Sequence, residues 1–295
     1  MTQFDDEFSP PFTIVEPPAW RAPIIFNSPP SGSIYPRQFL AASRIDVAAL
    51  RRSEDSFMDE LIGHLSSRGF PVVSVKFPRS YVDVNREPYE LDPRMFTGRL
   101  PSFANTRSIR VAGGLGTIPR VVGDGQEIYR ERLDVDDALN RIEMLYKPYH
   151  RALRHLINKA HSTFGTAILI DCHSMPSVGV SRDEPPRPDV VIGDRYGTSC
   201  TPVLRDCVEE TLGQLGYSLG RNKPYAGGFI TEHYGNPASG LHTIQIELNR
   251  AIYMDERRRE RGPRFASIAA DFTVLAEALA MLPLSDFGPF QAAAE

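Results

Sequence analysis

The sequence has 295 residues, a formal net charge of −4 at pH 7 and a pI near 6.0, so it is long enough for one large domain or two small ones with a well-filled core. Its hydrophobic and charged fractions, 41% and 24%, are ordinary for a globular protein, and no basic stripe with interleaved aromatic residues indicates a nucleic-acid partner. No apolar run reaches about 18 residues and no basic-then-apolar leader opens the chain, so neither a membrane span nor a secretory signal is expected.

The N-terminal part divides into an arm and the start of a domain. Residues 1–20 are acidic, aromatic and proline-rich without periodicity, which predicts an extended arm on the surface of a domain formed by residues 21–295. Residues 23–26 predict a short buried strand that leads into a turn-rich loop. A helix is expected from about residue 56 to Gly69, with Asp55 or Ser53 as its cap.

The middle of the chain alternates between a strand, an irregular stretch and a long helix. Residues 71–77 predict a strand, whereas residues 87–130 give no firm element. The glycine-rich run at residues 113–117 lacks a following Lys-Ser/Thr pair, which disfavours a phosphate-binding loop. A helical pattern begins at Asp134, which can cap it, and Pro148 should kink or divide this helix.

The C-terminal half continues the alternation of strands and helices. Strands are expected at residues 167–170, 190–192, 217–219 and 242–248, and helices at residues 201–215 and 263–281. This alternation indicates a single α/β domain in which a central sheet is flanked by helices.

Polar groups that could carry chemistry follow several of these strands. Asp171 and His173 come just after the apolar run at residues 167–170, and because they are two residues apart they share one face of an extended chain. Glu247 lies in the apolar surroundings of a predicted strand, where an unpaired carboxylate is costly. Two alternatives stay open: Glu247 is a general base, or it forms a salt bridge with Arg250 or another arginine.

A set of motifs in the right order resembles the N-formylglutamate amidohydrolase (deformylase) family, a distant relative of zinc carboxypeptidases. The motifs are Asn-Ser-Pro-Pro-Ser-Gly at residues 27–32, Val-Asp-Val-Asn-Arg at 82–86, Lys-Pro-Tyr-His at 147–150, Asp-Cys-His-Ser at 171–174, Gly-Gly-Phe-Ile-Thr-Glu-His-Tyr-Gly at 227–235 and Gln-Ile-Glu-Leu-Asn-Arg at 245–250. The resemblance extends from about residue 22 to 280 and implies a carboxypeptidase-like (phosphorylase/hydrolase-like) fold with a mixed sheet.

The resemblance also implies roles for individual residues. It implies hydrolysis of a linear amide in a small N-acyl amino acid such as N-formylglutamate, by water activated on one Zn²⁺, within amino-acid catabolism. Glu247 would be the catalytic base and acid, and Asn85 and Arg86 would bind the substrate carboxylate. The implied metal ligands are His173 and Asp55, with Glu54 and His233 as further candidates, and Asp171 would orient a neighbour from outside the ligand set.

One departure from the family pattern bears on the metal. The family has Pro-His-Ser-Gly in the first loop, and its histidine is a principal zinc ligand, whereas this chain has Pro30 there and Ser33 where the related carboxypeptidases have glutamate. A catalytic zinc normally takes three protein ligands, so the implied set is incomplete. His150 and His242 are interpreted as structural.

Two functions are therefore carried forward. The first is the zinc amidohydrolase, and the alternative is a metal-free, non-catalytic relative that binds a small carboxylate. Three cysteines without framework spacing favour a reducing cytoplasm. The expected partner is a small molecule rather than nucleic acid or a membrane, and the sequence does not indicate an oligomeric state.

Overall fold

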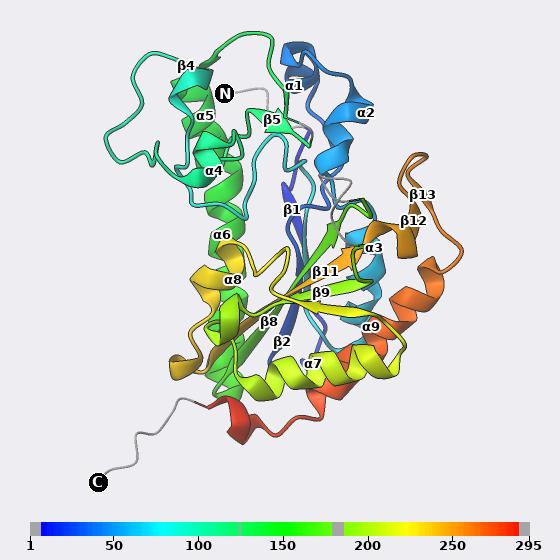
Figure 1. Cartoon of the computed structure of the whole chain (residues 1–295). Helices are drawn as coiled ribbons and strands as arrows, with labels where there is room; N and C mark the ends of the chain where they lie inside the picture. Colours follow the sequence, from blue (N-terminus) through cyan, green and yellow to red (C-terminus); the bar gives the residue numbers. More distant parts are fainter. Residues whose placement is uncertain (1–6, 124, 179–185, 289–295) are drawn as a thin grey trace. The chain divides into compact units, whose positions relative to one another are not determined.

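The computed structural model describes residues 7–123, 125–178 and 186–288 (Figure 1). The predicted arm at residues 1–20 therefore lies partly outside the described residues. The chain divides by its internal contacts into two compact units. The sheet unit comprises Ile14–Ser28, Phe57–Val73 and Arg154–Glu295, and the loop-rich unit comprises Met1–Thr13, Pro29–Ser56 and Ser74–Leu153. The predicted domain boundaries, an arm at residues 1–20 and a domain at residues 21–295, stay a prediction.

A seven-stranded sheet forms the framework of the sheet unit. Its strand order is β1-β3-β2-β8-β11-β9-β10. β8 runs parallel to both β2 and β11, and β10 runs parallel to β9, whereas β9 runs antiparallel to β11. The mixed sheet of the predicted α/β class is thus confirmed. The strands are β1 (Phe12–Val15), β2 (Ile24–Ser28), β3 (Val72–Val75), β8 (Ala167–Met175), β9 (Val190–Gly193), β10 (Leu219–Arg221) and β11 (Leu241–Asn249).

Helices flank both faces of this sheet. One face packs against α3 (Met58–Gly63), α7 (Pro202–Gln214) and α9 (Phe265–Ala280), and α7 and α9 lie side by side (Figure 1). The other face receives the short helix α8 (Phe229–Tyr234), which contacts β8 and β11. A hairpin of β12 (Met254–Asp255) and β13 (Glu260–Arg261) follows β11.

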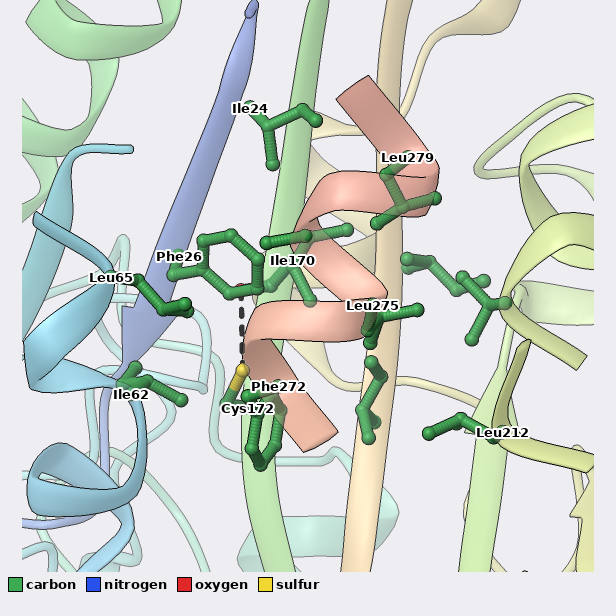
Figure 2. Packing of buried hydrophobic residues seen from close by; sticks show 14 of the residues in the cluster. Ile24, Phe26, Ile62, Leu65, Ile170, Cys172, Leu212, Phe272, Leu275 and Leu279 are labelled. Carbon is green, nitrogen blue, oxygen red and sulfur yellow. Dashed lines mark hydrogen bonds between the residues drawn. The ribbon is translucent and has the colours of Figure 1, made fainter. Parts of the chain in front are cut away.

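The main core lies between the sheet and the three helices. Alternate residues of β2 and β8 point toward α9, and Figure 2 shows Phe26 and Ile170 facing Phe272 and Leu275. Residues at alternate positions of a strand share a face, so the intervening residues of the same strands belong to the opposite face. Burying one large apolar side chain in this way contributes about 1.5–3 kcal/mol.

β8 is longer than the apolar run that predicts it. The strand continues to Met175, so Asp171 and His173 lie within it rather than just after its end, which corrects their predicted placement. The polar continuation stays extended because β11 pairs with β8 along the whole strand, from Leu241 opposite Ala167 to Asn249 opposite Met175. Such pairing supplies hydrogen bonds that the local sequence does not reveal.

The predicted start of the first long helix is wrong in its cap. α3 begins at Met58 after Phe57, whose φ is 67°, and within the described residues no side chain caps it. Ser53 instead donates its hydroxyl to the carbonyl of Leu50. The expected end at Gly69, whose φ is 95°, is confirmed after a 3-10 segment.

The loop-rich unit contains short elements joined by long connections. Its helices are α1 (Arg37–Ala42), α2 (Val47–Leu50), α4 (Ile109–Ala112), α5 (Val135–Arg141) and the first part of α6 (Lys147–Phe164), and its short strands are β4 (Phe96–Thr97), β5 (Val121–Val122), β6 (Gln126–Glu127) and β7 (Leu133–Asp134). Asp134 caps α5 as predicted, by accepting a hydrogen bond from the amide of Asp136. A π-helical segment, Ile142–Tyr146, lies between α5 and α6 just before Pro148, so the hydrogen-bond pattern changes next to the proline while the backbone stays helical.

A buried arginine organises the core of the loop-rich unit. The Arg141 guanidinium lies 4.0 Å from the centre of the Tyr81 ring and donates a hydrogen bond of 2.8 Å to the Tyr129 hydroxyl. Asp137, one turn earlier in α5, completes the set with an ion pair of 2.5 Å. A buried cation needs such partners because its desolvation is costly, so this cluster fixes α5 within its unit.

Candidate functional site

A row of buried polar side chains crosses the sheet on the face opposite the main core. Pairing places Asn27 of β2 opposite Asp171 of β8, which in turn lies opposite Gln245 of β11. His173 lies opposite Glu247 in the same register. All five side chains are buried, and residues paired across neighbouring strands point to the same face. The shared face predicted for Asp171 and His173 is confirmed, and the pairing of β8 with β11 places Glu247 on the same face.

Asp171 links Asn27 to His173. The side-chain amide of Asn27 donates to Asp171 Oδ1 at 2.8 Å, and Asp171 Oδ2 lies 2.8 Å from Nε2 of His173. An imidazole that donates Nε2–H to a carboxylate carries its lone pair on Nδ1 when neutral. This arrangement, in which a carboxylate orients a histidine, is the one that supports metal-binding histidines. The role of Asp171 and of His173 toward a metal is nevertheless a proposal.

Glu247 is held from its own strand. Gln245 Nε2 donates to Glu247 Oε1 at 2.8 Å, and Gln245 Oε1 accepts hydrogen bonds from the amide of Gly228 at 2.8 Å and from Thr231 Oγ1 at 3.3 Å. Arg250, the alternative partner of Glu247, begins the 3-10 turn after β11 and donates Nε to Ser174 Oγ at 3.0 Å. The Glu247 carboxylate is thus buried and oriented by its neighbour, and its role as a general base stays a prediction.

The loop-rich unit holds the predicted carboxylate-binding pair. Asp83 forms ion pairs with Arg79 at 2.8 Å and Arg86 at 3.4 Å, and it accepts a hydrogen bond from the amide of Asn85. Burial alone would raise the pKa of Asp83, but the two guanidinium groups hold it well below its ordinary value. Burial lowers the pKa of Arg86 to about 10, so this side chain remains a cation at neutral pH.

Helix α6 and the preceding π segment hold this loop by its carbonyl groups. Tyr146 donates its hydroxyl to the carbonyl of Arg86 at 2.7 Å, and Nε2 of His150 lies 2.8 Å from the carbonyl oxygen of Val84. The expected structural role of His150 fits this contact. Arg86 also donates Nε to the carbonyl of Leu115 at 2.8 Å. The loop is thus rigidly supported, and substrate binding by Asn85 and Arg86 stays a prediction.

The two acidic candidates before α3 differ in their surroundings. Glu54 accepts hydrogen bonds from Arg51 through both carboxylate oxygens, from Tyr35 at 3.0 Å and from Ser56 at 2.8 Å. Holding a metal would require Glu54 to give up these donors. The fully buried Asp55 instead donates its backbone amide to the carbonyl of Pro30 at 2.9 Å. The position that carries histidine in the family therefore adjoins Asp55 within this unit.

His233 lies on the outer side of α8. Thr231 of the same helix faces the sheet, and two residues further along a helix correspond to a turn of about 200°. The His233 ring stacks on Phe229 at 4.8 Å, and its Nε2 lies 3.1 Å from Nη2 of Arg154. Burial and the charge of Arg154 lower the pKa of His233. Its role as a metal ligand also stays a prediction.

The candidate metal ligands are divided between the two units: His173 and His233 belong to the sheet unit, and Asp55 and Glu54 belong to the loop-rich unit. Across the described part of the chain, no group of three histidine, cysteine, aspartate or glutamate side chains is arranged to hold a metal ion. Pro30 offers no donor atom, and within the sheet unit His173 is the one implied ligand that is oriented by a carboxylate. Zinc and its set of ligands stay a prediction.

A mixed α/β sheet with buried carboxylate, imidazole and amide groups along one face is typical of an α/β enzyme. Residues 22–254 match the family model of N-formylglutamate amidohydrolase. The chain therefore belongs to the N-formylglutamate amidohydrolase family, which confirms the resemblance drawn from its motifs. No helix in the ranges that the structure describes is long and apolar enough to cross a membrane.

Individual relatives agree with this assignment. N-formylglutamate deformylases of Pseudomonas putida and Pseudomonas aeruginosa are 28% and 29% identical over 243 and 241 residues, which is 80% of this chain and 83% and 84% of theirs. The crystal structure of N-formylglutamate amidohydrolase from Ralstonia eutropha JMP134 has a TM-score of 0.86 and 34% identity, covering 92% of this chain and 97% of that one. A protein of Agrobacterium tumefaciens with 16% identity and a TM-score of 0.63, covering 91% of this chain and 93% of its own, shares the fold.

Asn27 and Gln245 are two further functional candidates. Both lie within the family motifs, but their types and positions alone do not indicate a role. Each carried a signal: Asn27 directly follows a buried apolar strand, and Gln245 shares a strand face with Glu247. An amide at such a position must be hydrogen-bonded.

Proposed function

We propose that this chain hydrolyses the formyl amide of N-formylglutamate to formate and glutamate. The membership of the family supports the substrate, and the observation that carries the chemistry is the buried Glu247 carboxylate, oriented by Gln245 in the same polar row as His173. Chains of the named activity share 28–29% identity with this one over most of its length.

In the proposed reaction Glu247 acts first as base and then as acid. It takes a proton from a water molecule that adds to the formyl carbonyl carbon, and it returns that proton to the nitrogen as the C–N bond breaks. The hydrogen bond from Gln245 Nε2 to Glu247 Oε1 holds this carboxylate in one direction, which suits it to repeated proton exchange with the reacting groups. Asn85 and Arg86 are proposed to bind a carboxylate of the substrate, for which a guanidinium offers paired donors.

The proposal includes zinc dependence, for which the surroundings of His173 are the main structural support. A bound zinc would polarise the carbonyl and activate water, and His173 supported by Asp171 has the surroundings of a metal ligand. The ligands proposed with it are Asp55, Glu54 and His233, and the metal-free carboxylate-binding relative is the alternative.

The test is hydrolysis of N-formyl-L-glutamate by purified wild-type protein and by Glu247→Gln. Turnover by the wild-type protein, with a loss of about 10³-fold or more in kcat for the variant, is expected if Glu247 transfers the proton. Normal turnover by Glu247→Gln would remove this residue from the mechanism. Chelation followed by added zinc, with bound metal measured on the same samples, separates a zinc enzyme from a metal-independent one.

A further inference from the structure

The hydrogen bonds around Gln245 allow only one orientation of its side-chain amide. Its Oε1 accepts from the Gly228 amide at 2.8 Å and from the Thr231 hydroxyl at 3.3 Å. With the amide reversed, the NH₂ group would face the N–H donor of Gly228 and the oxygen would face the carboxylate of Glu247. Both contacts would then be repulsive. The NH₂ group therefore points to Glu247 Oε1, 2.8 Å away.

The donors that fix Gln245 are themselves held in place by a closely packed loop. Gly228 precedes α8, and Gly227 has a φ of 114°, a conformation that favours glycine. A Cβ atom at Gly227 would lie 2.8 Å from Thr231 Cγ2, and one at Gly193 of β9 would lie 2.7 Å from the carbonyl carbon of Ala226. Backbone that approaches this closely has little room to shift, so the Gly228 amide is a fixed donor.

We infer that Gln245 is the positioning residue for the proton-transferring carboxylate of Glu247. Residue Gln245 is 3% exposed and residue Glu247 is 6% exposed, so water does not replace the bond easily. A donated hydrogen bond favours the ionised carboxylate and fixes its rotamer. Gln245 thereby keeps Glu247 in the form and direction needed to take a proton from water. This inference rests on the proposed function for the role of Glu247.

A structural role is the competing explanation, since Gln245 also ties the start of α8 to the sheet. Gln245→Glu separates the two roles. A glutamate keeps the acceptor for Gly228 and Thr231, but it replaces the donor to Glu247 with a second carboxylate. When two carboxylates lie within hydrogen-bond distance, the pair keeps one shared proton up to a higher pH than an isolated carboxylate keeps its own proton. Asp171 and His173, which lie opposite the pair on β8, and Glu232 and His233 of α8 are unchanged in this comparison.

The matched control is Thr243→Val on the same strand and the same face. Thr243 is fully buried two residues before Gln245, and its hydroxyl has no hydrogen-bond partner among the described residues. This isosteric change alters the buried surface of β11 without touching the bond to Glu247. Wild-type kcat and pH dependence are expected for the control.

The experiment measures kcat and KM for N-formyl-L-glutamate from acidic to alkaline pH in the wild type, Gln245→Glu and Thr243→Val. For Gln245→Glu we expect kcat at neutral pH to fall at least about tenfold with KM nearly unchanged, and the acidic limb of kcat/KM to move up by about one pH unit or more. An unchanged kcat and pH profile in a folded Gln245→Glu would overturn the inference while leaving the proposed function intact.

A second measurement does not depend on turnover. The side-chain ¹H–¹⁵N signals of Gln245, identified by their loss in Gln245→Glu, are expected to shift with pH in the wild type and to stop shifting in Glu247→Gln. If the Gln245 signals have the same pH dependence in the wild type and in Glu247→Gln, the contact between Gln245 and Glu247 is overturned, whether or not substrate is cleaved. If the wild-type signals shift with pH but no N-formyl-L-glutamate is hydrolysed, the result counts against the proposed function alone.

Discussion

Replacing Asn27 by alanine tests the polar row at its most buried point. Asn27 and Asp171 are both fully buried, and the Asn27 side-chain amide donates to Asp171 Oδ1 at 2.8 Å. A hydrogen bond to a charged group contributes about 1.5–3 kcal/mol, and the acceptor left behind keeps its desolvation cost. We therefore expect the free energy of unfolding to fall by about 2–3 kcal/mol and the melting temperature by about 4–10 °C.

Urea unfolding followed by circular dichroism measures this change, and Asn249→Ala is its control. Asn249 is also buried in the sheet unit, but its NH₂ group donates to the neutral carbonyls of Arg187 and Pro188 at 3.4 and 3.3 Å, and its Oδ1 accepts from Ala251. Long bonds to neutral acceptors predict a loss of only about 1 kcal/mol. If Asn27→Ala costs no more than Asn249→Ala, the reasoning that assigns a charge-assisted bond to Asp171 is refuted.

Two further predictions concern stability. Gly32→Ala should lower the free energy of unfolding by about 2–3 kcal/mol, because the new Cβ would lie 2.0 Å from the Phe77 carbonyl oxygen. Gly63→Ala should raise the free energy of unfolding by about 0.5–1 kcal/mol, because no heavy atom lies within 4 Å of its new Cβ. Calorimetry of both variants against the wild type checks these opposite signs. Burial lowers the pKa of His242, which lies between Thr201 and Phe287. As the pH falls, the unfolded chain therefore takes up this proton before the folded chain does, and the free energy of unfolding should decrease below about pH 6.5. His242→Phe should weaken this decrease, as measured by urea unfolding at pH 5.5 and 7.5. An equal change between the two pH values in the wild type and the variant would exclude His242 as its source.

Local patterns predict the sheet unit well because its strands and helices have clear periods. The alternation in residues 242–248 identifies β11, and the two-residue spacing of Asp171 and His173 places both on one face. The helix expected at residues 263–281 forms α9, and its apolar residues, which include Phe272 and Leu275 at helical spacing, pack in the core against the sheet.

Non-local contacts account for what the sequence does not reveal. The extension of β8 to Met175 depends on pairing with β11, and the bond between Asn27 and Asp171 joins residues 144 positions apart. The turn before α3 depends on Phe57 adopting a positive φ, which is uncommon outside glycine, so spacing places the cap wrongly. The stretch from residue 87 to 130 lacks a period because its elements are very short and are held by side chains such as Thr117, whose hydroxyl bonds to the carbonyl of Glu87.

Cys172 lies between Asp171 and His173 in the sequence, yet its thiol lies on the opposite face of the sheet from their side chains. It faces the apolar core with Phe272, and its sulfur lies 3.7 Å from the carbonyl oxygen of Ile170 (Figure 2). Burial and the neighbouring Asp171 raise its pKa well above the ordinary value, and burial raises that of Cys200 to about 12. Since the thiolate is the reactive form, alkylating reagents should leave Cys172 unmodified while the protein is folded. Modification of Cys172 itself, as distinct from the partly exposed Cys207, would therefore report that the sheet has opened, and the chain carries its own chemical indicator of unfolding beside the candidate site.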